Sequence, residues 1–397
     1  MIRFILPLCA IASIGPLTGF IPREAAYILS LSVLVAASVT IVMKDKYRKK
    51  VIYRFTHYYP YWVFAIILIT SQVIVSATRV YTVYGMLKSV AYVIVLGTTL
   101  IVISCGVYYE RKSFWSSVAT FISFVSVVGM IGTYTSMFSK GLFVSTIYDI
   151  PVIGIKPLSS IISDENYYSF VAGVGIFSGI YSSRCSKSIK KRAFLKSTVA
   201  VNVAGIILAG SRTGYAAIIV SWILYLNTGR KYDLLKALSG ALAAGMLIIG
   251  LTYVIATDKL FAIFEVTRGL TGREELWSVG LESIKQNPLF GSGIGNLEDV
   301  LYQGGIVKAS THNTYIDLAV QAGVLSALSL TAIILSSLMN LIDGGKKPYK
   351  KFLISILVFC IIFSNSLTFT PGGLSFGGLL FAIILGQPIV EMYNEKN

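Results

Sequence analysis

Apolar blocks close to 20 residues long recur along this 397-residue chain, and they restrict its fold more than any other feature. A helix needs about 20 apolar residues to cross the hydrocarbon of a bilayer, whereas helices of soluble domains average about 11 residues. Charged residues make up only 13% of the chain, against roughly 25% in soluble domains. We therefore predict an all-α integral membrane protein with about twelve transmembrane helices.

The predicted spans follow one another without a linker-type boundary or a repeat, so residues 1–397 are expected to form a single membrane domain. The first block is counted as a span because no small-x-small cleavage site follows it. The four cysteines lie far apart in or beside apolar blocks, which favours small apolar packing residues over disulfides or metal ligands. The spans are expected at residues 4–21, 25–43, 60–77, 87–109, 114–138, 167–183, 194–210, 214–227, 237–256, 314–340, 352–368 and 372–390.

The formal net charge of +16 is distributed unevenly over the two sides of the predicted membrane. With these spans, 23 of the 34 lysines and arginines fall on one side, together with both chain ends. An excess of basic residues marks the cytoplasmic side. The charge then reflects orientation in the membrane and contact with anionic lipids, so nucleic acid is not an expected partner.

Two loops on the opposite side are long. Residues 139–166 are apolar, carry prolines and glycines, and end in Asp164-Glu-Asn166. Residues 257–313 hold five of the basic residues on this side. Because loops on rigid scaffolds carry function more often than the scaffold does, we expect the working surface on this second, periplasmic loop.

A short helix is predicted inside the loop of residues 257–313. Thr271-Gly-Arg-Glu274 has the form of a capping box, so the helix should begin at about Gly272. Asn287-Pro288 should end it. One face collects the positions Leu276, Gly280 and Ile284. The glycine run of residues 290–295 that follows could approach a phosphate with its backbone or form a tight turn, and the sequence leaves both possibilities open.

The two histidines of the chain differ in position. His57 lies among tyrosines at the cytoplasmic interface, where aromatic belts are ordinary. His312 is placed where the long loop meets the next span, so it could act as a base or simply cap and hydrogen-bond the helix. Asp317 lies four residues after Asn313 on the same helix face, where an acid could serve function or only complement the helix dipole.

Basic side chains gather on the same side as His312. Arg212 stands in a very short turn, where its guanidinium could grip a phosphate or merely snorkel to the interface. Together with the residues of the long loop it would form a phosphate-binding surface that has one potential base. The set is Arg212, Arg268, Arg273, Lys308 and His312. This constellation suits chemistry on a lipid-linked phosphate or diphosphate.

Several short motifs occur in the order that is typical of the O-antigen ligase/O-antigen polymerase family, which residues 200–340 resemble. The motifs are Gly210-Ser-Arg-Thr-Gly214, Thr271-Gly-Arg-Glu-Glu-Leu-Trp277, Asn287-Pro-Leu-Phe-Gly-Ser-Gly-Ile-Gly295, His312-Asn-Thr-Tyr-Ile and Gln321-Ala-Gly323, with Asp164-Glu-Asn166 earlier in the chain. The resemblance implies a GT-C-like helical fold and an inverting, metal-independent glycosyltransferase without a cofactor. It implies an undecaprenyl-diphosphate-linked glycan as donor, location in a bacterial inner membrane and a periplasmic active site.

The resemblance also implies roles for individual residues. Arg212, Arg273 and His312 match essential arginines and a loop histidine, and are expected to be catalytic. The arginines would stabilise the departing diphosphate, and His312 would accept the proton of the acceptor hydroxyl. Further substrate-binding residues are expected at Arg268, Lys308, Asn313, Asp317 and Asn166.

Three functions remain to be distinguished. A polymerase would join lipid-linked repeat units and could have a chain-length regulator protein as partner, whereas a ligase would transfer the glycan to a lipid A core sugar. The compact loop slightly favours a polymerase. A flippase or other transporter would need ionisable residues along the middle of its spans, but here the basic residues lie at span ends and in loops.

Overall fold

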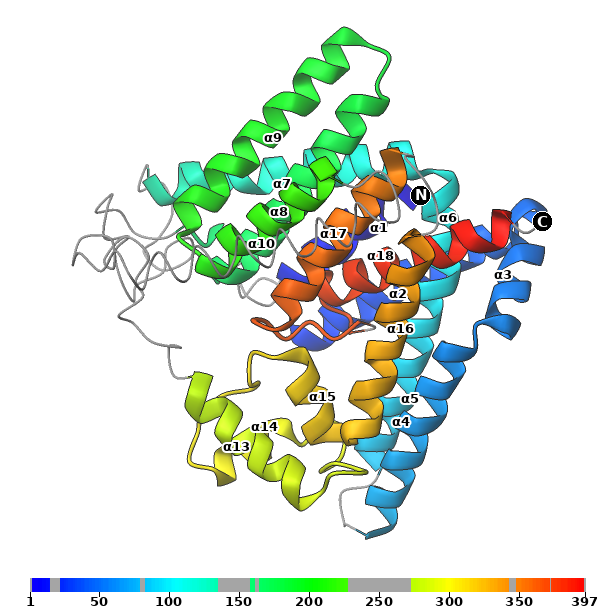
Figure 1. The fold of residues 1–397 in the computed structure, drawn as a ribbon, viewed down its shortest axis with the longest axis vertical. Helices are drawn as coiled ribbons and strands as arrows, with labels where there is room; N and C mark the ends of the chain where they lie inside the picture. Colours follow the sequence, from blue (N-terminus) through cyan, green and yellow to red (C-terminus); the bar gives the residue numbers. More distant parts are fainter. Residues whose placement is uncertain are drawn as a thin grey trace. The chain divides into compact units, whose positions relative to one another are not determined.

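In the computed structural model every regular element among the described residues is a helix, and these residues are 2–14, 22–78, 83–134, 158–160, 164–227, 273–342, 348–371 and 373–395 (Figure 1). These residues fall into two compact units, each built from separate stretches of the chain. Unit 1 comprises residues 1–37, 109–269 and 341–363, and unit 2 comprises residues 38–108, 270–340 and 364–397. The expected all-helical class is confirmed for the described residues.

Unit 1 is a bundle around α8 (Glu165–Cys185), which is buried along most of its length. It packs against α7 (Arg111–Tyr134) and α9 (Ile189–Ala209), and α8 and α9 lie side by side in Figure 1. The other helices of this unit are α1 (Ile5–Ile14), most of α2 (Arg23–Val42), α10 (Arg212–Asn227) and most of α17 (Pro348–Ser364).

Small residues and one amide hold the helices of unit 1 together. A Cβ added at Gly173 of α8 would lie 2.1 Å from the Phe359 ring, so this glycine lets the ring approach the helix backbone. The buried Asn202 amide donates to the Ser123 hydroxyl and accepts from the Ser126 hydroxyl, both at 2.9 Å. Close approach at small residues and interhelical hydrogen bonds are the ordinary means of packing helices inside a bilayer.

Unit 2 combines long apolar helices with a group of short ones. The amphipathic α3 (Asp45–His57) leads into α4 (Tyr59–Thr78), which runs beside α5 (Val83–Gly97) (Figure 1). A π-helical turn (Thr98–Ile103) joins α5 to α6 (Ser104–Tyr109) and packs against α18 (Phe376–Glu395). The remaining helices are α13 (Arg273–Gln286), α14 (Leu297–Gln303), α15 (Thr314–Ala322) and α16 (Val324–Ile342).

Six helices among the described residues are long and apolar enough to cross a membrane. They are Ala25–Val42, Tyr59–Thr78, Val83–Tyr109, Arg111–Thr133, Ile189–Ala209 and Val324–Leu341, and shorter apolar helices occur at Arg212–Leu226 and Phe376–Val390. The expected span at residues 237–256 and most of the loop at residues 139–166 lie outside the described residues. The count of twelve spans therefore stays a prediction.

The expected span at residues 314–340 is divided into two helices at Gly323. This glycine has a φ of +81°, and a Cβ added to it would lie 1.9 Å from the Leu289 carbonyl oxygen. The next residue, Val324, donates its backbone N–H to the Pro288 carbonyl at 2.8 Å. Because the chain turns here to meet residues 288–290, α15 is a separate short helix that precedes the candidate span.

Candidate functional site

The short helices α13, α14 and α15 of unit 2 share a small hydrophobic core, and this core positions the candidate site. Leu276 of α13, Leu297 and Leu301 of α14, and Val320 of α15 are buried together. The predicted helix of the long loop is confirmed, since α13 runs from Arg273 to Gln286. Its predicted inner face is confirmed as well, because Leu276 and Gly280 are buried and Ile284 packs against the core.

Arg273 is the first residue of α13 and is half-buried. Its guanidinium Nη1 donates to the Ser366 hydroxyl at 3.1 Å. The N–H groups at a helix start carry partial positive charge, and a guanidinium beside them also attracts anions. The geometry at this end of α13 therefore suits a phosphate oxygen.

The carboxylate of Asp317 is fully buried and organises the loop that precedes α15. One oxygen, Oδ1, accepts the backbone N–H of Thr311 at 2.8 Å and the hydroxyl of Thr311 at 2.6 Å. The other, Oδ2, accepts the hydroxyl of Thr368. Burial raises the pKa of the Asp317 carboxyl, against the opposing effect of these hydrogen bonds and of His312.

His312 lies between two residues that are fixed by hydrogen bonds. Before it, the Thr311 carbonyl accepts from the Trp277 indole N–H of α13 at 3.0 Å. After it, the Asn313 side chain caps α15 by accepting the N–H groups of Tyr315 and Ile316 at 3.0 and 3.2 Å. His312 itself has a φ of +56°, which is the left-handed region, and it is partly exposed. Non-glycine residues in this conformation concentrate at functional sites.

A polar segment at residues 364–369 connects Arg273 to α15. Ser366 accepts from Arg273, and the neighbouring Leu367 carbonyl accepts the Thr314 hydroxyl at 3.0 Å. Thr368 donates to Asp317. The segment thus joins the start of α13 to the start of α15, and it brings Arg273 and the His312 loop into one hydrogen-bonded framework.

The glycine run after α13 is a folded turn rather than an open phosphate cradle. The N–H groups of Ser292 and Gly293 donate to the carbonyls of Val320 and Gln321 at 2.7 and 2.9 Å. Those of Ile294 and Gly295 donate to the side-chain oxygens of Gln72 and Gln321 at 2.8 and 2.9 Å. Since all four N–H groups have acceptors inside the protein, they are not available to a phosphate.

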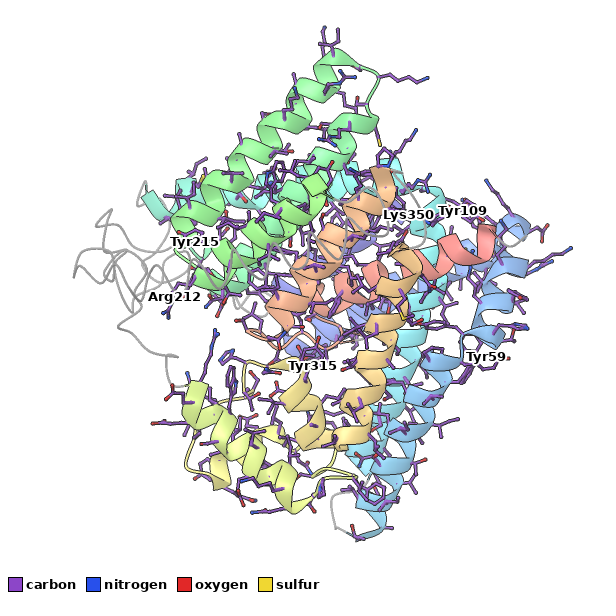
Figure 2. All side chains as sticks on the ribbon, viewed as in Figure 1. Tyr59, Tyr109, Arg212, Tyr215, Tyr315 and Lys350 are labelled. Carbon is purple, nitrogen blue, oxygen red and sulfur yellow. The ribbon has the colours of Figure 1, made fainter. Side chains whose placement is uncertain are left out.

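Arg212 lies in unit 1, where it begins α10 (Figure 2). Gly210 ends α9 with a φ of +65°, and Ser211 caps α10 by accepting the N–H of Gly214 at 3.2 Å. The Ser211 hydroxyl also donates to the Asn166 side-chain oxygen at 2.7 Å. The turn is as short as expected, and Asn166 holds it in place from the start of α8.

Of the other residues predicted to form the site, the structure describes some and not others. Lys308 is exposed on the loop before His312. Arg268 and the predicted cap Thr271 lie outside the described residues. Hydroxyl and amide groups that were not predicted as site residues also shape the site, namely Gln72, Thr311, Ser366 and Thr368, together with Gln321, which appeared in the sequence only as part of a motif. A polar run at residues 364–368, at the edge of a predicted span, was a usable signal for Ser366 and Thr368.

Comparison with known proteins supports the resemblance drawn from the motifs. Residues 197–331, which include Arg212, Arg273, His312 and Asp317, match the family described as O-antigen ligase. The chain is also similar to the exopolysaccharide production protein ExoQ of Rhizobium meliloti (strain 1021), with 24% identity over 134 residues. That match covers 30% of this chain and 31% of the relative, so the chain aligns with less than a third of that protein.

Proposed function

We propose that this chain is a membrane glycosyltransferase that extends or transfers a polysaccharide, with a glycan linked to undecaprenyl diphosphate as its donor. One observation carries the proposal: Arg273 and His312 both lie in the segment that matches the O-antigen ligase family, and hydrogen bonds to residues 366–368 join Arg273 and the His312 loop in one framework. The framework combines an anion-binding group with a potential base. This is the pair that glycosyl transfer from a diphosphate needs.

In the proposed reaction, His312 takes the proton from a hydroxyl of the acceptor sugar, and the oxygen attacks the anomeric carbon of the donor. The bond between that carbon and the diphosphate oxygen breaks, and attack from the opposite face inverts the configuration. The leaving diphosphate gains negative charge, which Arg273 stabilises through paired hydrogen bonds. A similar role is proposed for Arg212 from its motif. A diphosphate is already a good leaving group, so the reaction is proposed to proceed without a metal.

The buried network assigns supporting roles to two other predicted residues. Asp317 is proposed to position the His312 loop, because both of its oxygens accept hydrogen bonds from Thr311 and Thr368. Asn313 is proposed to orient the same loop through its cap of α15. Lys308, Arg268 and Asn166 remain proposed contacts of the substrate or of the groups that hold it.

The nature of the acceptor separates the leading proposal, a polymerase, from the alternative, a ligase. The name of the matching family favours the ligase, while the name of the similar protein concerns exopolysaccharide production. Deleting the chain from its host and analysing the lipid-linked glycans tests both. Loss of a polymerase should leave single repeat units on the lipid. Loss of a ligase should leave long polymer on the lipid, and unchanged glycans would refute both proposals.

A further inference from the structure

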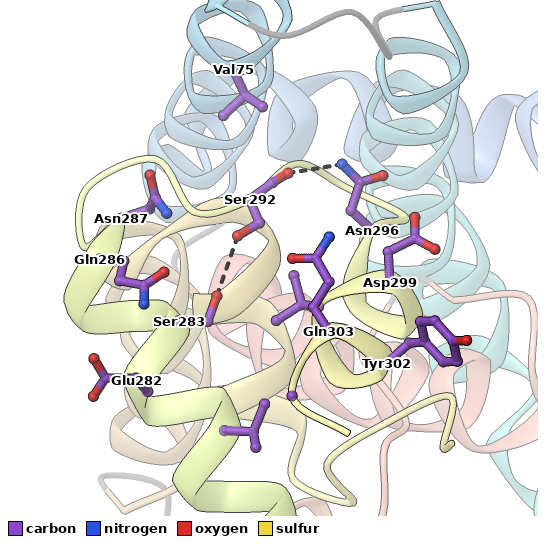
Figure 3. Close-up of a pocket in the computed structure, with 13 residues that line it drawn as sticks. Val75, Glu282, Ser283, Gln286, Asn287, Ser292, Asn296, Asp299, Tyr302 and Gln303 are labelled. Carbon is purple, nitrogen blue, oxygen red and sulfur yellow. Dashed lines mark hydrogen bonds between the residues drawn. The ribbon is translucent and has the colours of Figure 1, made fainter. Parts of the chain in front are cut away.

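A cavity of about 610 Å³ lies between α13 and α14 in unit 2, beside the end of α13 that is far from Arg273 (Figure 3). Its volume is within the ~300–1,000 Å³ range of small-molecule binding sites. Residues from the two helices and from the glycine turn form its walls, and Val75 of α4 contributes an apolar patch. The cavity plays no part in the chemistry described above. The residues that line it indicate which kind of ligand it can bind.

Amides, hydroxyls and acids dominate this lining. Ser283, Gln286 and Asn287 line one side, and Asn296, Asp299 and Gln303 line the other (Figure 3). A carboxamide both donates and accepts hydrogen bonds, and a carboxylate accepts them. Each hydroxyl of a sugar also donates and accepts, so such a wall is complementary to a carbohydrate. Tyr302, which is 70% exposed, adds an aromatic ring on which the C–H face of a sugar can pack.

Three of these polar side chains are available to a ligand. The carboxylate of Glu282 pairs with Lys285 at 3.2 Å, and the Asn296 amide donates to the Ser292 carbonyl at 2.9 Å. In the described part of the chain, by contrast, the side chains of Gln286, Asp299 and Gln303 have no hydrogen-bond or ion-pair partner. A ligand can therefore bond to them without breaking an internal hydrogen bond.

The charge of the lining selects against phosphate and other anions. No lysine or arginine occurs among the described residues that line the cavity, whereas Glu282 and Asp299 both do. Phosphates are bound by arginine and lysine, and like charges repel at close range. The ligand that fits is a neutral or amino-bearing oligosaccharide rather than the diphosphate group.

The position of the cavity fits the glycan part of a lipid-linked substrate. Its α13 residues are Val279, Glu282, Ser283 and Gln286, which follow Arg273 on the same helix. With a rise of 1.5 Å per residue, they lie roughly 9–20 Å along the axis from Arg273. A few sugar units can cover that distance.

We propose that this cavity binds the neutral or amino-sugar portion of the glycan while the diphosphate is held at Arg273. This inference rests on the proposed glycosyltransferase function. It adds a specificity site for sugars in which Asp299 and Gln303 make the direct hydrogen bonds.

A binding experiment tests the cavity without requiring transfer. The probe is the oligosaccharide released by mild acid from the lipid-linked glycan of the host, labelled at its reducing end and free of phosphate. Full-length protein in nanodiscs should bind it saturably, and D299A/Q303A should raise its Kd at least tenfold. E298A is the matched control, because Glu298 is an exposed acid on α14 that does not line the cavity, and it should leave Kd unchanged. No saturable binding, or equal Kd values for wild type and D299A/Q303A, would overturn the proposal.

Two further arms separate this proposal from the proposed reaction. A tetragalacturonate, which carries four carboxylates, should not displace the labelled probe, and efficient displacement would contradict the charge argument. Arg273→Lys should leave probe binding intact while lowering transfer from the complete lipid-linked donor. If Arg273→Lys leaves transfer unchanged but D299A/Q303A abolishes probe binding, the reaction proposal fails and the sugar site stands. If Arg273→Lys lowers transfer but D299A/Q303A leaves probe binding unchanged, the proposed reaction stands and the proposed sugar site is refuted.

Discussion

Thr311 donates both its backbone N–H and its hydroxyl to a single oxygen of Asp317, at 2.8 and 2.6 Å. The two residues are six positions apart, and the loop between them contains His312. The buried carboxylate thus fixes the chain on the N-terminal side of the proposed base, while Asn313 caps the helix on the other side. The conformation of His312 depends on this arrangement.

Removing the Asp317 carboxyl should destabilise the loop. Asp317→Ala leaves the buried Thr311 N–H without its acceptor, at a cost of about 1–3 kcal/mol, and removes the acceptor of the partly buried Thr368 hydroxyl. Asp317→Asn keeps a side-chain oxygen for Thr311 and should unfold at nearly the wild-type temperature. Thermal unfolding of the purified variants, together with proteolysis at the His312 loop, provides the measurement. Equal stability of the alanine variant and the wild type would contradict the positioning role.

The raised pKa of Asp317 also predicts a dependence of stability on pH. Burial raises the pKa of the carboxyl above its ordinary value of 3.8, so the folded protein holds this proton more tightly than the unfolded chain does. The stability contribution of this group is therefore present at low pH and is lost as pH rises from 3.8 through the folded pKa. Asp317→Asn cannot ionise and should lack this component when unfolding temperature is followed against pH.

Replacing His312 tests the proposed base. His312→Ala and His312→Asn should both lower turnover by about 10²–10⁴-fold, the usual size of general-base catalysis, with donor affinity largely kept. Asparagine adopts positive φ values readily, so His312→Asn preserves the backbone conformation at φ +56°. Turnover and donor half-saturation are measured separately. Near-normal turnover in the asparagine variant would assign His312 a conformational role instead.

Conservative changes at the arginines test diphosphate binding. Lysine keeps the charge but loses the planar pair of donors, so Arg273→Lys or Arg212→Lys should lower transfer about 10–100-fold, the equivalent of ~1.5–3 kcal/mol for a charge-assisted hydrogen bond. Arg48→Lys is the control, because Arg48 is an exposed arginine of α3 that forms an ion pair with Asp45 and has no proposed role in the reaction. Unchanged polymer yield in both test variants would contradict diphosphate binding by these arginines.

Two glycines with nearly equal positive φ values differ in how closely other parts of the chain approach them. Gly305 and Gly323 have φ values of +82° and +81°, but a Cβ at Gly305 meets nothing within 4 Å, whereas one at Gly323 meets the Leu289 carbonyl at 1.9 Å. Gly305→Ala should cost only ~1–2 kcal/mol of left-handed strain. Gly323→Ala should cost ~1–3 kcal/mol more, because the chain must move apart. Similar unfolding free energies for the two variants would contradict the close approach at Gly323.

Membrane orientation is tested by reporter fusions. The distribution of lysine and arginine predicts that Lys187 faces the cytoplasm and Glu298 the opposite side. Fusions of a cytoplasm-active and a periplasm-active reporter at these two positions should give opposite results. Activity of the same reporter at both would refute the predicted topology.

Local patterns were enough to predict the class of the protein and several features of the site. The apolar blocks predicted helices, and the capping-box pattern Thr271-Gly-Arg-Glu274 together with Asn287-Pro288 bounded α13 within about a residue of its observed ends. The closely spaced spans on either side of Gly210-Ser-Arg-Thr-Gly214 predicted a very short turn, and the turn between α9 and α10 is that short. These features depend on residues that are neighbours in the chain, so the sequence by itself determined them.

Tertiary structure decided what those residues can do. Asp317 is a buried hydrogen-bond acceptor because Thr368 reaches it from 51 positions away, and no local pattern contains that contact. The glycine run is closed to phosphate because Gln72, 222 positions from Ile294, accepts one of its N–H groups. The polar cavity exists because α13 and α14 pack on a common core. Hydrogen-bond acceptors and cavity walls are supplied by distant parts of the chain, so only the folded structure sets the chemistry available at each residue.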